Sequence, residues 1–358
     1  MATAKQITEA ARTIKAQIHS PNKNIPTLCA MTLDRWTVTG WISGTLVEFY
    51  LPDPIDGLTD EPVPTDPDGL LKAMKEYKPG ETVDIQVRDG QLVTAGVTLP
   101  APNTGDGWPE MPAHVVAGPT MYDPARILAV AQFASTDDLR PILTGVRFDE
   151  TGAVATDSYR LAVDERVKMT GEGVTLPGSV VAAVCKMSSG GDLAISHDAE
   201  TERYSVCTTT KAGSSVTISG RAIAGEFPDF QNLFPESFGT TAPLMVEQAQ
   251  KQAAKVNRWA DRNRPVTLTA IDNRYALGYT PSHMLVGGAQ VEPVAITGAS
   301  GGEAPGEPIG FNGEFFAAVL DYIAGDSAPT LNAISPLRPI MLQGDERRAL
   351  LMPIRLNV

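Results

Sequence analysis

An internal repeat of about 120 residues constrains the fold of this chain more than any other feature of its sequence. Three stretches read as strand, acidic turn and strand: residues 32–38, 146–155 and 268–277. Alternating β-formers around Asp, Asn and Gly are typical of hairpins. The turn aspartates Asp34, Asp149 and Asp272 lie 115 and 123 residues apart. We therefore expect one structural unit to occur three times.

A second marker has nearly the same period. Residues 105–110 resemble residues 225–229, because both segments place acidic residues beside an aromatic residue and a proline, and the two prolines lie 119 residues apart. The length of 358 residues allows two or three domains of about 150 residues each. Two markers with one period predict three similar domains, at residues 1–117, 118–236 and 237–358.

Each third of the chain is predicted to contain two helices. Asp66-Pro67 and Asp123-Pro124 each combine a good N-cap with a proline in the first helical turn. Apolar residues recur every three or four positions near both ends of the chain, as on one face of a helix. The expected helices are residues 2–19, 66–77, 123–135, 177–187, 246–260 and 312–323. The predicted fold class is α+β, with three repeated domains that each pack two helices on antiparallel sheets.

Composition narrows the class of protein further. Hydrophobic residues make up 42% and charged residues 20% of the chain, which is ordinary for a folded soluble protein. No apolar run approaches the roughly 18 residues of a membrane span, and the first residues do not resemble a signal peptide. The three cysteines, Cys29, Cys185 and Cys207, have no CxxC spacing. The sequence therefore predicts a cytoplasmic protein without a disulfide framework, a zinc cluster or a cofactor.

Motifs of catalysis are absent from the sequence. It contains no GxSxG, HExxH or GxxxxGK[ST], and its four histidines do not have metal-ligand spacing. Asp149 and Asp157 could form an acid–base pair, but aspartates in turns more often make local hydrogen bonds. Residues 298–310 are rich in glycine but contain no lysine, so they indicate a surface loop. We expect no enzyme, although an α+β enzyme with an unrecognised site remains an alternative.

The predicted helices carry basic stripes on their polar faces. Lys251, Lys255 and Arg258 are spaced four and three residues apart, opposite an alanine-rich face. Such a stripe is either an ordinary solvated face or a surface that contacts phosphates without regard to sequence. The net charge of −13 does not exclude the second reading, because the local field depends on where the charges lie.

Five motifs in the last two thirds resemble the bacterial DNA polymerase III β subunit, the sliding-clamp family. They are RPILTGVRFD (140–149), ATDSYRLA (155–162), GEFPDFQNLFP (225–235), GFNGEFFAAVL (310–320) and MPIRL (352–356). The first third matches more loosely, at residues 25–28 and 108–109. The three-fold repeat, found independently, agrees with the three-domain subunit of this family.

The resemblance implies a head-to-tail homodimer that closes a ring around double-stranded DNA. A non-catalytic processivity factor of this kind would tether DNA polymerase, a clamp loader and other proteins with a clamp-binding motif. It implies DNA-facing basic side chains at Lys5, Arg12, Lys15, Lys72, Lys75, Arg126, Arg140, Lys251, Lys255 and Arg258. The alternative function is a clamp-like scaffold for transcription or for resistance to a clamp inhibitor.

The resemblance also implies a cleft for partner peptides between the central and C-terminal domains. Its residues here would be Leu143, Thr156, Ser158, Tyr159, Arg160, Leu161, Pro228, Asn232, Leu233, Met352, Pro353, Ile354 and Arg355. Apolar walls would bury a Leu and a Phe of the peptide, and Arg160 and Arg355 would bond its polar groups. Ser158 and Tyr159 stand where the family usually has Gly-His, which changes the depth of the pocket. Asn232 stands where an Arg is common.

Overall fold

The computed structural model describes residues 1–17, 31–42, 45–101, 114–115, 119–234, 240–260, 265–279, 290–301 and 307–356. Cys29 and the expected marker at residues 105–110 lie outside these ranges. The six expected helices form, as α1 (Ala4–Gln17), α2 (Pro67–Ala73), α3 (Pro124–Ala131), α4 (Gly178–Met187), α5 (Val246–Trp259) and α6 (Gly313–Ile323). Short 3-10 helices are η2 (Met74–Glu76), η3 (Pro141–Thr144) and η4 (Gln231–Leu233).

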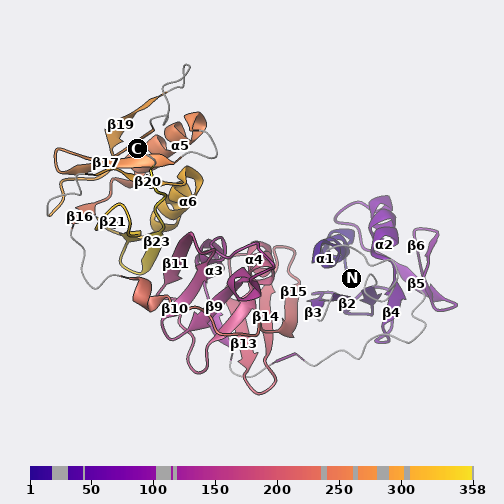
Figure 1. The fold of residues 1–358 in the computed structure, drawn as a ribbon. Helices are drawn as coiled ribbons and strands as arrows, with labels where there is room; N and C mark the ends of the chain where they lie inside the picture. The colour runs from indigo at the N-terminus through magenta and orange to yellow at the C-terminus, as the bar shows by residue number, and fades with distance from the viewer. Residues whose placement is uncertain are drawn as a thin grey trace. The chain divides into compact units, whose positions relative to one another are not determined.

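The strands are numbered along the chain (Figure 1). The first third holds β1 (Met31–Leu33), β2 (Thr37–Ile42), β3 (Thr45–Tyr50), β4 (Val63–Thr65), β5 (Ile85–Arg88), β6 (Gln91–Thr94) and β7 (Val97–Leu99). The middle third holds β8 (Thr120–Tyr122), β9 (Gly145–Asp149), β10 (Gly152–Thr156), β11 (Arg160–Asp164), β12 (Val174–Pro177), β13 (Leu193–Asp198), β14 (Arg203–Thr209) and β15 (Ser215–Arg221). The last third holds β16 (Thr240–Pro243), β17 (Val266–Ile271), β18 (Arg274–Tyr279), β19 (Val291–Ala295), β20 (Ile309–Phe311), β21 (Thr330–Ala333), β22 (Ile340–Gln343) and β23 (Arg347–Leu351).

One strand order occurs three times along the chain. The orders β4-β1-β2-β3, β12-β9-β10-β11 and β20-β17-β18-β19 all place the fourth strand of a group beside its first. Along the chain, each group is followed by three strands that pair with one another in order: β5-β6-β7, β13-β14-β15 and β21-β22-β23. Every pairing between these strands is antiparallel, as in β1 with β2 and β10 with β11. The predicted α+β class and the internal repeat are thus both present in the fold.

The two large sheets each combine strands from two thirds of the chain. One sheet has the order β4-β1-β2-β3-β15-β14-β13-β8, and the other has the order β12-β9-β10-β11-β23-β22-β21-β16. Contacts divide the chain into two compact units, residues 1–128 with 180–222, and residues 129–179 with 223–358. Each eight-stranded sheet lies within one unit, and the predicted boundaries near residues 117 and 236 stay a prediction.

Close packing of helix on sheet forms the core of the first unit. Ile7, Ala11 and Ile14 of α1 are fully buried, as their helical spacing predicts. A Cβ atom on Gly40 of β2 would lie 2.2 Å from Cγ2 of Ile14, so only glycine allows this approach. The Asp66 side chain accepts a hydrogen bond from the Gly69 N–H at 2.6 Å and caps α2 as expected.

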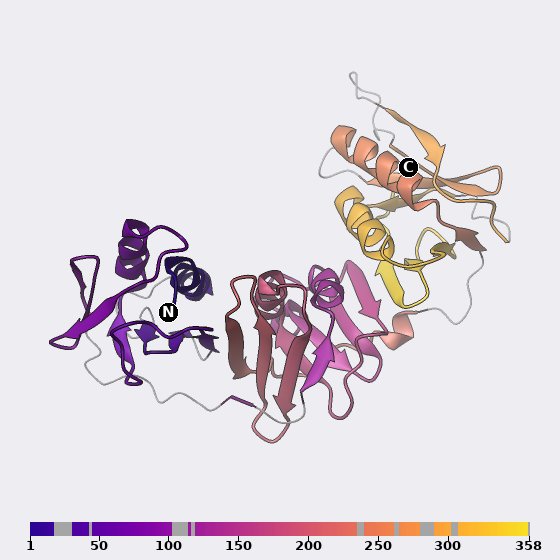
Figure 2. The same cartoon turned by 180° about the vertical axis from the view of Figure 1, so that it is seen from behind.

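In the second unit α5 and α6 pack side by side (Figure 2). Helix α5 buries Ala249, Ala253 and Val256 against the neighbouring elements. The buried Gln252 amide donates hydrogen bonds to the carbonyls of Leu277, at 2.9 Å, and Glu292, at 3.1 Å. Helix α6 packs on β22, β23 and β11, and so covers one face of the second large sheet.

Candidate functional site

A tight turn joins β10 to β11 at the centre of the predicted cleft residues. The Asp157 carboxylate accepts hydrogen bonds from the N–H groups of Tyr159, at 3.0 Å, and Arg160, at 2.9 Å. The Thr156 hydroxyl donates to the Arg160 carbonyl at 2.8 Å and accepts from the Ser158 N–H at 3.1 Å. Ser158 has a φ of 76°, in the left-handed region that favours glycine. These bonds present Tyr159 to solvent, with 59% of the residue exposed.

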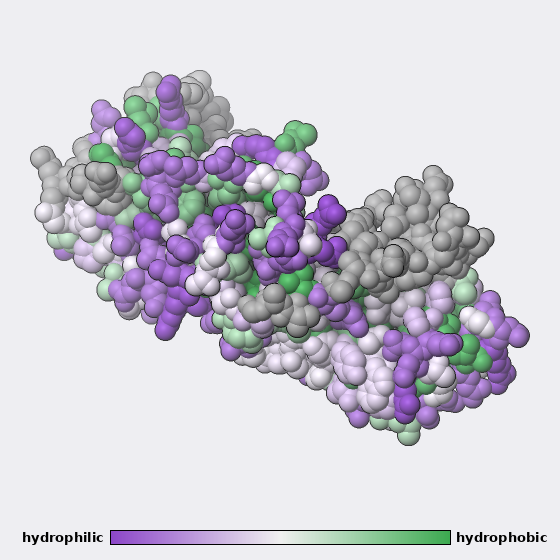
Figure 3. Space-filling view, turned by 90° about the horizontal axis from the view of Figure 1, so that it is seen from below, coloured by the Kyte–Doolittle hydropathy of each residue, from purple (hydrophilic) through white to green (hydrophobic). Residues whose placement is uncertain are grey.

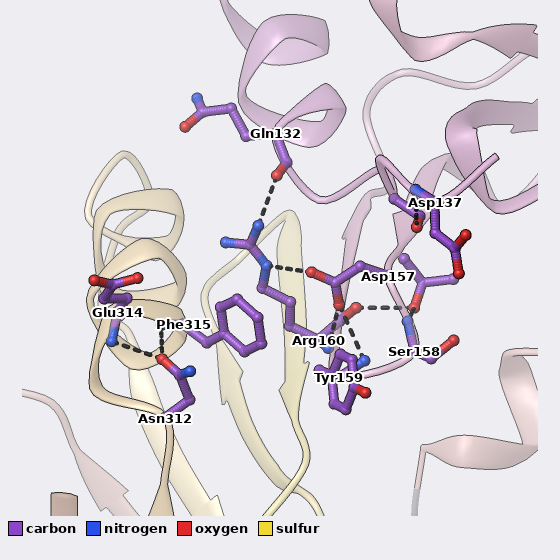
Figure 4. Close-up of polar contacts among 11 residues, drawn as sticks. Gln132, Asp137, Asp157, Ser158, Tyr159, Arg160, Asn312, Glu314 and Phe315 are labelled. Carbon is purple, nitrogen blue, oxygen red and sulfur yellow. Dashed lines mark hydrogen bonds and ion pairs between the residues drawn. The ribbon is translucent and has the colours of Figure 1, made fainter. Parts of the chain in front are cut away.

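The Arg160 side chain turns inward from this turn (Figure 4). Its guanidinium pairs with the Asp157 carboxylate at 2.9 Å and donates to the Gln132 carbonyl at 3.0 Å. The guanidinium carbon lies 4.9 Å from the ring centroid of Phe133 and 4.8 Å from that of Phe315. Only 15% of the side chain is exposed. Arg160 was expected to bond a peptide, whereas the structure has it joining three parts of its own unit.

The start of α6 places Phe315 against this turn. Asn312 caps the helix, because its side-chain oxygen accepts from the N–H groups of Glu314, at 2.9 Å, and Phe315, at 3.1 Å. The rings of Tyr159 and Phe315 lie 5.9 Å apart between centroids, tilted by 32°. Figure 4 shows Phe315 beside both Arg160 and Tyr159. The Met352 N–H donates to the Tyr159 carbonyl at 2.8 Å, which places the residue after β23 beside the same turn.

The opposite face of β11 lies under an apolar cluster. Its buried members are Val154, Leu161, Val163, Phe230, Met341 and Leu350, with Phe227 and Phe234 packed against them. Pro228 and Leu233 flank Phe230 in the same segment and are exposed. Asn232 bonds the Asp229 carboxylate, and Leu143 is buried in η3. The structure therefore brings Leu161 together with the segment that carries Pro228 and Leu233.

The last predicted cleft residues continue from β23 toward β20. The Ile354 N–H donates to the Gly310 carbonyl at 2.8 Å, and Pro353 is half-buried. Ile354 and Arg355 help to line an open groove of about 630 Å³. Its other lining residues are Glu307, Pro308, Pro336, Leu337 and Leu356. Leu337 is 70% exposed, so this groove presents apolar surface to solvent.

An ion pair crosses the junction of β11 and β23. Asp164 is fully buried, and its carboxylate lies 3.4 Å from Nε of Arg347. The same guanidinium donates to the Tyr322 carbonyl at 2.9 Å and lies 5.2 Å from the centroid of the Tyr322 ring. A buried charge of this kind depends on its partner, because its hydration is lost.

Most of the predicted DNA-facing cations of the first unit lie around α1 and α2. The two helices line a groove of about 640 Å³ that contains Lys5, Arg12 and Lys75, with Glu9 among them. Lys72 is exposed, and Lys15 pairs with Asp68. Arg126 is half-buried at α3.

In the second unit the basic residues Lys251, Lys255 and Arg258 are exposed on α5, opposite its buried stripe. Helix α6 has the acidic residues Glu314 and Asp321 and no basic residue. Arg140, expected to face DNA, donates to the Ser158 hydroxyl at 2.9 Å and therefore lies at the turn described above. The face drawn in Figure 3 is mostly hydrophilic, and its hydrophobic residues form small separate areas.

Other features give no sign of a reactive centre in the described ranges. Burial, with a smaller contribution from Asp123, raises the pKa of the Cys185 thiol to about 12. Burial also raises the pKa values of Tyr122, Tyr204 and Tyr275. Among the described residues, no three His, Cys, Asp or Glu side chains converge as metal ligands. No helix within those ranges is both long and apolar enough to cross a membrane.

Several residues of this site were not expected from the sequence. Phe227, Phe230 and Phe234 pack on the sheet, whereas Pro228, Asn232 and Leu233 were selected from that segment. The aromatic spacing of three and four residues was the available signal. Phe133 and Phe315 carry no comparable signal, because each meets Arg160 only through tertiary packing.

Comparisons with known proteins agree with this architecture. No family model matches the chain. A beta sliding clamp from Streptomyces coelicolor is 29% identical over 173 residues, 45% of each chain, and one from Micrococcus luteus is 26% identical over 226 residues. The match to the second covers 58% of this chain and 71% of that protein. The chain spans less than half of the length of the first relative.

A solved DNA polymerase III beta subunit from Thermotoga maritima superposes with a TM-score of 0.80 at 18% identity. That superposition covers 99% of this chain and 98% of the other. The chain therefore has the sliding-clamp fold. Its sequence is similar to those of beta sliding clamps, and its fold is that of solved beta subunits of DNA polymerase III.

Proposed function

We propose that this protein is a sliding clamp, a non-catalytic processivity factor of DNA replication. Two copies would close a ring around double-stranded DNA, with three clamp domains each, at residues 1–117, 118–236 and 237–358. The observation that carries the proposal is the position of the basic residues on α1, α2 and α5. They stand on solvent faces, opposite the buried stripes, in a chain with a net charge of −13.

This charge distribution suits sliding. Exposed cations on a few helices attract phosphates of any sequence, while an acidic remainder limits binding elsewhere. The protein would be held on DNA by encirclement, so strong contacts with the phosphates are not required. The proposed DNA-facing residues are Lys5, Arg12, Lys15, Lys72, Lys75 and Arg126 in the first unit and Lys251, Lys255 and Arg258 in the second; Arg140, which lies at the β10–β11 turn, is assigned to the peptide cleft instead.

The proposed peptide cleft lies at the turn between β10 and β11. Tyr159 and Met352 offer exposed apolar surface there, and Leu233 offers more on the aromatic segment over β11. A Leu or Phe anchor of a polymerase or loader peptide would gain about 1.5–3 kcal/mol on full burial. Arg160 would act as a positioning residue that holds the turn, while the exposed Arg355 would bond polar groups of the peptide.

The first test is the mass in solution by light scattering. One subunit has a mass of 38.0 kDa, so the ring predicts twice that value at all working concentrations. A persistent monomer would contradict a closed homodimer.

The second test is topological trapping on DNA. The protein is mixed with a linear duplex carrying biotin at both ends, streptavidin is added, and the salt concentration is then raised. Encircled protein should remain on the blocked duplex and leave an unblocked one, whereas protein bound sideways leaves both as its phosphate contacts weaken. Changing Lys251, Lys255 and Arg258 together to Glu should lower the trapped fraction several-fold. The matched control changes Arg88, Arg221 and Arg274, which are exposed on strands rather than on these helices, to Glu.

The scaffold alternative predicts a different outcome of the same tests. A scaffold would still bind partner peptides but would not be retained on the blocked duplex. The two functions are therefore separated by trapping rather than by peptide affinity.

A further inference from the structure

We propose that Trp259, with Lys255 and Arg258, forms a site on α5 that binds an unpaired nucleic-acid strand. The inference rests on the proposed function, because it takes α5 as a DNA-facing helix. It goes further by assigning this helix a preference for single-stranded over duplex segments, for example at a junction between the two.

The exposure of Trp259 is the first observation. It is the last residue of α5, and 56% of it is exposed. The buried residues of the helix are Ala249, Gln252, Ala253 and Val256, and the indole is not among them. Within the described ranges, no ring stacking or cation contact involves Trp259, whereas Trp36 stacks on Tyr50 at 6.1 Å between centroids. A large apolar ring presented to water in this way is typical of a binding surface.

The charges around the indole indicate its partner. Lys255 lies four residues before Trp259, which places both side chains on one side of the helix. Lys255 and Arg258 are exposed, while Lys251, one turn further back, faces Glu247 at 4.0 Å. The positive charge is thus least compensated at the end that carries the indole. The carbonyl end of a helix itself disfavours anions, so the two side chains would hold the phosphates.

The neighbouring helix limits where an anionic strand could lie. Helix α6 packs beside α5 and exposes Glu314 and Asp321, without any basic residue. A polyanion would therefore follow α5 rather than cross to α6. A protein partner of opposite charge would not require the aromatic face.

The chemistry of bases selects the unpaired strand. In a duplex, both faces of each base are already stacked, and the phosphates alone are available to this helix. An unpaired base has a free π-face, and an indole beside cations stacks on it with little dependence on base identity. The site should therefore add affinity for single strands and leave duplex affinity almost unchanged.

The test compares the affinities of the full chain for fluorescein-labelled (dT)20 and for a 20-base-pair duplex at low salt. Trp259→Leu keeps an apolar side chain but removes the stacking face, and should weaken (dT)20 binding about five- to tenfold. Its effect on the duplex should stay below twofold. Trp259→Phe should retain most of the strand affinity, because a phenyl ring still stacks. Equal effects of Trp259→Leu on both ligands, or no effect on either, would overturn the proposal.

Two controls complete the experiment. Trp36→Leu makes the same substitution at a ring already stacked on Tyr50, and should change neither affinity. Binding of (dT)20 should quench tryptophan fluorescence in the wild type and in Trp36→Leu, but much less in Trp259→Leu. Trapping of Trp259→Leu on the end-blocked duplex should equal that of wild type. Failure of trapping in both proteins would count against the ring, whereas selective loss of strand binding concerns only this site.

Discussion

The two large sheets contain equivalent junctions that differ in what covers them. In the first unit β3 pairs with β15, and in the second unit β11 pairs with β23. At the first junction, Leu46, Val47 and Phe49 of β3 are buried, whereas Glu48 is half-buried and Tyr50 is exposed. At the second junction, Leu161 to Asp164 are all buried, so both faces of β11 are covered.

The described residues that follow two of the three-strand groups make different contacts with the sheets. After β15, a segment with Phe227, Phe230 and Phe234 packs on the junction of β11 and β23. After β7, the described residues His114 and Val115 dock on the β3–β15 sheet through polar contacts. The His114 ring lies 2.6 Å from the Ser219 hydroxyl and 2.5 Å from the Glu48 carboxylate, and the Val115 N–H donates to Ser205 at 2.8 Å.

One strand order can therefore support an apolar junction or a polar one, depending on a short connecting segment. This contrast explains why we assign a peptide cleft to one junction alone. An apolar anchor needs a surface that already excludes water, and among the described residues the aromatic segment provides it over β11.

The largest effect is expected from breaking the buried ion pair of the second junction. Arg347→Leu leaves the carboxylate of Asp164 buried without the Arg347 guanidinium, which should lower the free energy of unfolding by about 3–5 kcal/mol. Urea unfolding followed by circular dichroism measures the change. Arg166→Leu is the matched control, because Arg166 pairs with Glu346 at 3.2 Å while 67% exposed, and should cost less than about 1 kcal/mol. Equal losses in both variants would contradict the role assigned to burial.

Shortening one side chain in each covering segment should distinguish the apolar junction from the polar one. Phe230→Ala removes a ring that is 6% exposed, with an expected loss of about 3 kcal/mol. His114→Ala removes hydrogen bonds at a half-buried surface and should cost about 1 kcal/mol. The same urea experiment compares them, and a larger loss for His114→Ala would reverse the apolar and polar assignments.

The peptide cleft should be removable without loss of the fold. Met352→Ala with Arg355→Ala deletes exposed side chains, so a fluorescent peptide with Leu and Phe anchors should bind at least tenfold more weakly. The mass in solution should not change. Met121→Ala with Arg88→Ala, two exposed residues of the first unit, should leave peptide binding intact. Undiminished peptide binding by the first pair would place the cleft elsewhere.

The smallest expected effect concerns the reactivity of the two thiols of the first unit, Cys185 and Cys207, measured in a Cys29→Ser variant. Cys207 lies opposite Thr217 on the more open face of the sheet, and Cys185 is buried. A disulfide reagent at pH 8 should modify Cys207 more than tenfold faster, because the pKa of Cys185 is about 12 and its thiolate is scarce. Similar rates would show that burial does not protect Cys185.

The raised pKa of Cys185 also makes the stability of the folded state depend on pH. The unfolded thiol ionises near pH 9 and the folded one near pH 12, so its contribution is complete below pH 9 and is lost as the pH rises toward 12. Cys185→Ala should reduce the fall in stability across this interval.

The helices and hairpins were predictable because their signals are local. The helix expected at residues 246–260 forms at Val246–Trp259, and Asp89 and Gly90 take the positive φ angles of a tight hairpin turn. The expected cleft was predictable only in part. Tyr159 and Met352 meet at the junction, but Arg160 lies between two phenylalanines that no sequence pattern connects with it.

The sequence by itself determined the three-fold period, the six helices, the acidic balance and the basic stripes. The helices and the stripes depend on spacings within one helix, the acidic balance on composition, and the period on local signals that recur about every 120 residues. Only the tertiary structure decided that β3 joins β15 and that β11 joins β23, and which segment covers each junction. Strand pairs so distant in the chain are selected by the burial of whole faces. That burial is a property of the assembled sheet and leaves no local pattern in either strand.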